Sequence, residues 1–273
     1  MKFRILALSA ILLLAANIQA LAAPRADLWP RWDKHDPGST VTVDHSAWDR
    51  FLKTYLVTDH PSGIHLLRYG AVTPADRQAL TEYLDLLQGV PVSDLDRAEQ
   101  RAYWINLYNA LTVKVILDHY PVSSIRAVDI SPGWFSRGPW DAKLVRIEGE
   151  KISLNDIEHR ILRPIWRDPR LHYAVNCASI GCPNLQPQAF TAGNTEDLLE
   201  KGAREYVNHP RGASKEGNRL VLSSIYDWFR EDFGGSEEGV KKHLSRFADT
   251  SLSRELEGFR GKISYRYDWS LNE

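Results

Sequence analysis

Cysteine is scarce in this 273-residue chain, because Cys177 and Cys182 are its only two. Two cysteines cannot supply the set of disulfides that holds many small secreted domains together. No second Cys/His pair at ligand spacing accompanies them, so we expect neither a zinc site nor any other metal or cofactor. The chain also lacks a phosphate-binding glycine loop and a Gly-x-Ser-x-Gly elbow, which are signatures of nucleotide-binding proteins and of serine hydrolases.

An excess of one charge sign is also absent. The 34 lysines and arginines nearly balance the 35 aspartates and glutamates, for a formal net charge of −1. Nucleic-acid-binding domains usually carry a basic excess, so no nucleic-acid partner is expected. Aromatic residues are, by contrast, plentiful: nine tryptophans and eleven tyrosines predict either aromatic core packing or a surface that stacks on sugars or peptides.

A long apolar run occurs at the amino terminus, over residues 5–16. Two basic residues precede it and Ala20-Leu21-Ala22 follows it, an order typical of a secretory signal peptide. The run is shorter than the roughly 20 apolar residues of a membrane-spanning helix. We expect residues 1–22 to be a signal peptide that is cleaved after Ala22 or Ala23. The mature protein is then expected to be periplasmic or secreted, with no transmembrane segment.

The rest of the chain contains no linker, repeat or low-complexity tract. Residues 23–45 are polar and irregular, and residues 46–273 are expected to form a single domain. Helical spacing and capping signals predict one helix that begins at Ser46, a second after the Thr73-Pro74 cap that ends near Gln88, and a long third helix that begins after Ser93 and ends near His119.

Short strands are concentrated in the second half of the chain. The pattern predicts a hairpin over 144–152 and strands over 171–177, 219–222 and 263–267, with helices over 153–163, 194–208 and 236–247 between them. Helices first and short strands later predict an α+β fold, in which a helix-rich N-terminal half packs on a small, mainly antiparallel sheet.

Two amides lie in the apolar centre of the long helix. Asn106 and Asn109 are separated by three positions and therefore share one face. Asparagine competes for backbone hydrogen bonds and is a poor helix former, so two buried amides need partners. They either hold a loop that crosses the helix or orient a substrate or a catalytic group.

Glu158 and His159 are adjacent in the predicted helix 153–163. Neighbouring positions of an α-helix point about 100° apart, so we expect that these two side chains do not face one pocket. His159 is then either a ring packed beneath Arg163 and Trp166 or a general base.

The segment His172–Pro183 contains both cysteines. In an extended strand, His172 and Cys177 would lie roughly 16 Å apart. A Cys177 nucleophile would therefore need His159 as its base, or His172 after a reversal of the chain, because a thiol–imidazole pair requires hydrogen-bond contact. The alternatives are a structural Cys177–Cys182 disulfide, which would stabilise the fold by roughly 2 kcal/mol, and a reversible redox pair.

The chain as a whole resembles the domain of unknown function family 547. The segments 103–112, 153–163, 172–185, 225–235 and 267–272 are similar to its motifs in that order, over about residues 69–272. The motif His-x-x-x-Asn-Cys-x-Ser-x-x-Cys-Pro corresponds here to His172, Asn176, Cys177, Ser179, Cys182 and Pro183. The resemblance implies no activity, and it implies export for bacterial members.

Two function hypotheses follow from these residues. The first is a cysteine-dependent hydrolase or acyl transferase that acts on peptide or cell-envelope amides. Its catalytic residues would be Cys177, His159, His172 and Asn176, and its substrate-binding residues Asn106, Asn109, Glu158 and Ser179. The second is a non-catalytic binding module with a structural Cys177–Cys182 disulfide and an aromatic surface for a peptide, glycan or cell-envelope ligand.

Overall fold

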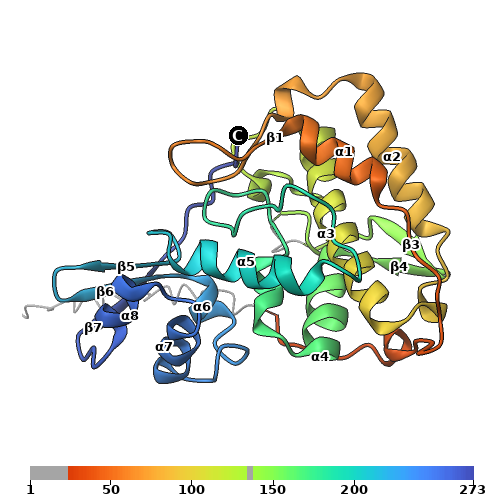
Figure 1. The fold of residues 1–273 in the computed structure, drawn as a ribbon. Helices are drawn as coiled ribbons and strands as arrows, with labels where there is room; N and C mark the ends of the chain where they lie inside the picture. Colours follow the sequence, from red (N-terminus) through yellow and green to blue (C-terminus); the bar gives the residue numbers. More distant parts are fainter. Residues whose placement is uncertain (1–23, 134–137) are drawn as a thin grey trace, which may run out of the picture.

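The computed structural model describes residues 24–133 and 138–273, so the predicted signal peptide lies outside the described residues (Figure 1). The helices are α1 Ser46–Tyr55, α2 Pro74–Gln88, α3 Arg97–His119, α4 Arg163–Trp166, α5 Thr195–Val207, α6 Ile225–Trp228, α7 Glu237–Ser245 and α8 Thr250–Leu256. The strands are β1 Leu56–Val57, β2 Leu66–Leu67, β3 Val145–Ile147, β4 Glu150–Ile152, β5 Ala213–Glu216, β6 Arg219–Ser223 and β7 Lys262–Arg266. The predicted α+β class, with a helix-rich N-terminal half, is confirmed.

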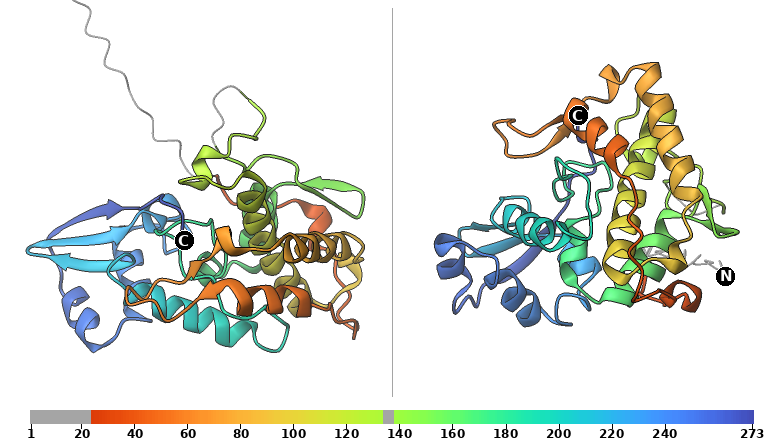
Figure 2. Two further views of the ribbon diagram at one scale, coloured as in Figure 1. Left: turned by 90° about the horizontal axis from the view of Figure 1, so that it is seen from above. Right: turned by 45° about the vertical axis from the view of Figure 1, so that its right-hand side comes forward.

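Helix α3 forms the centre of the larger hydrophobic core. It begins at a side-chain cap, because the carboxylate of Asp96 accepts a hydrogen bond from the N–H of Glu99 at 2.8 Å. From Ala102 to Leu117 nearly every side chain is buried. Helix α2 packs along α3 and α1 packs on α2, whereas the π-helical segment Asp156–Leu162 packs on another side of α3 (Figures 1 and 2).

A second hydrophobic cluster lies at the opposite end of the molecule from α1 and α2, between the sheet β5-β6-β7 and helices α7 and α8 (Figure 2). Strands β5 and β6 form an antiparallel hairpin in which Ala213 faces Leu222. Strand β7 is parallel to β6, with Leu220 opposite Ile263, because helices α6 to α8 form the connection that a parallel pair requires. The other two sheets are two-stranded and antiparallel.

The strand predicted over 171–177 is wrong. Residues Pro169–Tyr173 form a 3-10 helix, in which Asp168 accepts a hydrogen bond from the N–H of Arg170 at 2.9 Å and Pro169 occupies the first turn. This cap and the proline specify the turn locally. The chain therefore coils at His172 and does not extend from it to Cys177.

Two helix boundaries also differ from the prediction. Residues Val92–Asp94 form a 3-10 turn that ends at the fully buried Leu95, so α3 begins four residues after Ser93. The helix predicted to stop before Pro164 continues through it: a π-helix over Asp156–Leu162 leads directly into α4. No helix among the described residues is long and apolar enough to cross a membrane.

Candidate functional site

Asn106 and Asn109 hold two separate backbone segments, one of which contains both cysteines. The amide of Asn109 donates to the carbonyl of Ala174 at 2.9 Å and accepts from the N–H of Asn176 at 2.8 Å. Asn106 makes the same reciprocal pair with the backbone of Phe190, at 2.7 and 2.9 Å. Both amides are buried, so these bonds satisfy backbone groups that water cannot reach. Asn109 thus anchors the cysteine segment to α3 and Asn106 anchors the chain at Phe190, and a substrate contact for either stays a prediction.

Cys177 and Cys182 are joined by a disulfide, with their Cα atoms 6.2 Å apart. Asn176 braces both ends of the loop, because its Oδ1 accepts from the N–H of Ala178 and its Nδ2 donates to the carbonyl of Pro183, both at 2.7 Å. Ala178 is fully buried with a φ of 56°, a strained backbone conformation for an alanine. The disulfide predicted as one alternative is therefore present.

Tyr267 lies against this disulfide. Its hydroxyl is 3.0 Å from Sγ of Cys177, 3.0 Å from Oγ of Ser179 and 3.2 Å from Sγ of Cys182. Burial of the hydroxyl raises the pKa of Tyr267 well above its ordinary value, so the group is a neutral phenol at physiological pH. The disulfide loop thus fixes the position of a tyrosine that comes from the far end of the chain.

Backbone hydrogen bonds join the same loop to the C-terminal segment. The N–H of Ile180 donates to the carbonyl of Ser270, and the N–H of Gly181 donates to the carbonyl of Asp268, both at 2.8 Å. A Cβ at position 181 would lie 2.8 Å from the backbone of Asp268, so glycine is required for this close approach. The loop and the C-terminal segment therefore form one unit.

Four half-buried rings form what we call the aromatic surface: Trp140, Trp228, Tyr267 and Trp269. The ring centroid of Tyr267 is 4.8 Å from that of Trp228 and 4.6 Å from that of Trp269. Trp228 and Trp269 are nearly parallel, with an interplanar angle of 27° and centroids 5.6 Å apart. Trp140 meets Trp269 edge-on, and the guanidinium of Arg126 lies 5.2 Å from the centre of Trp269.

A buried group of ionisable side chains, the acid–histidine cluster, comprises Glu158, His159, Arg163, His172 and Asp232. Oδ2 of Asp232 accepts from Nε2 of His172 at 2.7 Å and from Nε of Arg163 at 2.6 Å. Oε1 of Glu158 lies 3.8 Å from Nδ1 of His172 and 3.9 Å from Nδ1 of His159. Glu158 and His159 thus lie close together in this cluster, and the expectation that they do not face one pocket stays a prediction.

The π-helix explains how these side chains converge. Each N–H of a π-helix binds the carbonyl five residues earlier, and the N–H of Arg163 binds the carbonyl of Glu158 in this way. Pro164 has no N–H to continue the pattern. The carbonyls of His159 and Arg160 accept instead from the N–H groups of Asp27 and Trp29, at 2.9 and 3.0 Å. The N-terminal segment thus completes this helix.

A hydrogen bond from Arg163 determines which ring nitrogen of His159 carries the proton. The Nη1 of Arg163 donates to Nδ1 of His159 at 3.0 Å, and an arginine can donate only to an unprotonated ring nitrogen. Burial lowers the pKa of His159 to about 4, in agreement with a neutral ring whose proton is on Nε2. Neither nitrogen of His159 is then available as a base in this arrangement.

His172 and Asp232 are also poor candidates for a base. His172 is buried, and Phe229 stacks on its ring with centroids 4.3 Å apart. Burial raises the pKa of Asp232, but hydrogen bonds from His172 and Arg163 outweigh this effect and hold it well below the usual range. Asp232 is therefore a permanent negative charge, and His172 is shielded from solvent.

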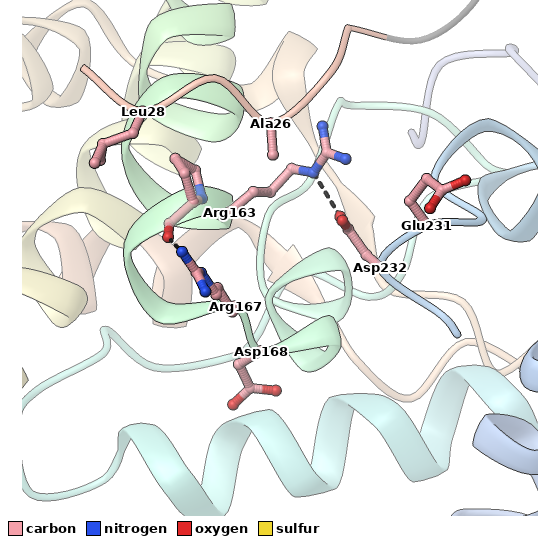
Figure 3. A pocket seen from close by; sticks show the side chains of 8 residues that line it. Ala26, Leu28, Arg163, Arg167, Asp168, Glu231 and Asp232 are labelled. Carbon is pink, nitrogen blue, oxygen red and sulfur yellow. Dashed lines mark hydrogen bonds and ion pairs between the residues drawn. The ribbon is translucent and has the colours of Figure 1, made fainter. Parts of the chain in front are cut away.

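A pocket of about 420 Å³ adjoins Asp232 (Figure 3). Ala26 and Leu28 of the N-terminal segment form one wall, and Glu231 and Asp232 form another. Arg163 and Arg167 reach into it from α4 and its C-terminal end, and a dashed line in Figure 3 marks the Arg163–Asp232 pair.

The structure brings some predicted site residues together and separates others. Glu158, His159 and His172 meet in the acid–histidine cluster, whereas Ser179 lies beside Cys177 and Cys182. Among the described residues, no hydrogen bond, ion pair or ring contact joins Cys177 to His159 or to His172.

Sequence reasoning missed four residues of these sites: Arg163, Asp232, Tyr267 and Trp269. Asp232, Tyr267 and Trp269 lie far along the chain from the acid–histidine cluster and the disulfide loop, so no local spacing could reveal them, whereas Arg163 lies four residues from His159. The available signal was the set of motifs at 153–163, 225–235 and 267–272, which contain all four.

An α+β domain with a braced disulfide loop is thus the class that the fold and the site define. Residues 92–207 match the sequence model of the family described as "Protein of unknown function, DUF547". The match supports the resemblance for this central part of the chain, which includes α3, most of the acid–histidine cluster and the disulfide loop. The motifs at 225–235 and 267–272 lie outside it. No curated protein and no solved structure matches the chain.

Proposed function

We propose that this chain is a non-catalytic binding module that holds a peptide or glycan of the cell envelope on its aromatic surface. The observation that carries the proposal is the Cys177–Cys182 disulfide. A thiol enzyme needs a free thiolate, and the chain has no other cysteine to supply one. The bridge instead supports Tyr267, which stands among the rings of the aromatic surface.

The composition of the aromatic surface suits stacking on a ligand. Tryptophan and tyrosine combine a large apolar face with a polar edge, which is why they are frequent at binding interfaces. Trp228 and Trp269 stack on each other and are each half-exposed, so part of the pair is accessible to a sugar ring or a planar peptide group. Arg126 adds a cation next to the same rings.

The acid–histidine cluster supports binding over catalysis. A general base works best when its pKa is near the ambient pH and its lone pair reaches the substrate. The pKa of His159 is lowered to about 4, and the ring nitrogen that would serve as acceptor is occupied by Arg163. The cluster behaves as a set of fixed charges that holds the π-helix, α4 and residue 232 together. Export to the periplasm is part of the proposal and rests on the N-terminal sequence.

The test is a titration of the mature chain with a disaccharide–tetrapeptide fragment of peptidoglycan, followed by tryptophan fluorescence. We expect Trp228→Ala and Trp269→Ala each to weaken binding about tenfold, the equivalent of roughly 1.4 kcal/mol. Trp166→Ala is the matched control, since Trp166 is also half-buried but packs beneath Arg97, outside the aromatic surface. Equal binding by all variants, no binding by the wild-type chain, or cleavage of the probe would overturn the proposal.

A further inference from the structure

A second pocket adjoins the one beside Asp232. It has a volume of about 340 Å³ and is bordered by Arg170, Arg246 and Phe247. Both pockets are lined by Arg167 and Asp168, so they meet at these two residues. Together they form a hollow between the N-terminal segment, the end of α4 and the end of α7. Each pocket alone is within the range of about 300 to 1,000 Å³ that small ligands occupy.

Ion pairs within the protein neutralise part of the charge in this hollow. Asp232 pairs with Arg163 at 2.6 Å, and Asp168 pairs with Arg170 at 2.7 Å. Burial raises the pKa of Asp168, but its hydrogen bonds with Arg170 outweigh this and lower it, so Asp168 remains committed to that pair. The charges that determine what the hollow attracts are therefore those outside these two pairs.

Three charged side chains that line the hollow take no part in these two ion pairs. Among the residues that the structure describes, Arg167, Glu231 and Arg246 form no salt bridge. Arg167 makes a long contact with the carbonyl of Pro164, at 3.4 Å, and Arg246 lies over the ring of Phe247, at 5.6 Å. The hollow thus has a negative end at Glu231 and a positive end between the two arginines.

The backbone at Arg167 ends α4 and sets the direction of this side chain. Its φ of 50° and ψ of 32° are left-handed, a conformation that costs a non-glycine residue about 1 to 2 kcal/mol. Glycine is the usual residue at such a helix end. An arginine in this position lines both pockets, and Figure 3 shows it in the pocket beside Asp232.

We propose that the hollow binds a short zwitterionic peptide with free ends. Its terminal carboxylate lies between Arg167 and Arg246, where a guanidinium can bind both carboxylate oxygens. Its terminal ammonium faces Glu231, the negative charge of the lining that lies outside the two ion pairs. This site is separate from the aromatic surface and does not depend on the function proposed for it.

The experiment is isothermal titration calorimetry of the mature chain with tri-alanine that has free ends. Tri-alanine with an acetylated amino terminus and tri-alanine with an amidated carboxyl terminus are the matched probes. We expect each modification to weaken binding about tenfold, as loss of one charge-assisted contact implies. Arg246→Ala and Arg167→Ala should make the chain insensitive to amidation, and Glu231→Gln should make it insensitive to acetylation.

The controls are Arg219→Ala and Glu257→Gln, which change exposed charges outside both pockets. Circular dichroism confirms that each variant is folded. Trp228→Ala should bind tri-alanine as the wild-type chain does, which distinguishes failure of this site from failure of the aromatic surface. The inference is overturned if tri-alanine does not bind, if the modified probes bind equally well, or if the control variants lose as much affinity as the pocket variants.

Discussion

The hydroxyl of Tyr267 lies 3.0 Å from Sγ of Cys177, across 90 residues of sequence. This contact links the disulfide loop to strand β7 and to the rings of the aromatic surface. The disulfide therefore has a structural consequence beyond the few residues that it encloses, because it determines where the C-terminal rings are held.

Removal of the bridge tests this consequence. We expect Cys177→Ala/Cys182→Ala to remain folded and to lose about 2 kcal/mol of unfolding free energy, the value for so small a closed loop. Binding of the peptidoglycan fragment should fall with it, since Tyr267 loses its support. Urea denaturation and the fluorescence titration measure the two effects. Unchanged stability and unchanged binding would show that the disulfide neither stabilises the fold nor positions Tyr267.

The buried histidines predict loss of stability in acid. Burial lowers the pKa of His45, His159 and His243 to about 4, whereas an unfolded histidine titrates near 6.5. Between these values the unfolded chain binds more protons, so the free energy of unfolding decreases as the pH falls from about 6.5 to about 4. Below this range the depressed pKa of Asp232 continues the decline, because its carboxylate pairs only when ionised.

Urea denaturation between pH 7 and pH 3 measures that decline. His159→Gln should give a shallower slope between pH 6.5 and 4, since glutamine cannot titrate. His60→Gln, which replaces an exposed histidine, should retain the wild-type slope. Constant stability from pH 7 to pH 4.5 would contradict the assignment of neutral, buried rings.

Asn109 is expected to act on stability. Asn109→Ala removes partners from two buried backbone groups, at Ala174 and Asn176, and each unsatisfied group costs about 1 to 3 kcal/mol. We therefore expect a loss of about 2 to 6 kcal/mol in urea denaturation, and a comparable loss for Asn106→Ala. A variant as stable as the wild-type chain would favour the substrate-binding role that the sequence left open.

Local signals in the sequence predicted local structure well. The cap of α2 lies within four residues, and Thr73 accepts from the N–H of Asp76 as Thr-Pro-Ala-Asp indicates. The hairpin β3–β4 and helix α5 were predicted for the same reason. At 171–177 the alternation of side chains favoured a strand, yet Asp168 and Pro169 specify a 3-10 helix, and no strand within residues 24–133 and 138–273 pairs with the segment.

The candidate site depends on contacts that no local pattern contains. Asp232 meets His172 across 60 residues, and the N-terminal segment meets the π-helix across more than 130. Glu158 and His159 lie in a π-helix, a form of helix that the local sequence pattern did not indicate. The sequence identified most of the reactive residues, but not their partners, and the partners decide whether each residue is available for chemistry.

The thiol state of the mature protein tests the central claim most directly. Alkylation without reductant, followed by intact-mass spectrometry, counts the free thiols. The structure predicts no alkylation before reduction and two alkyl groups after it, with no amide hydrolysis in either state. Two thiols that alkylate without reductant, with Cys177 the faster near neutral pH, would contradict the structural disulfide and favour a cysteine-dependent hydrolase.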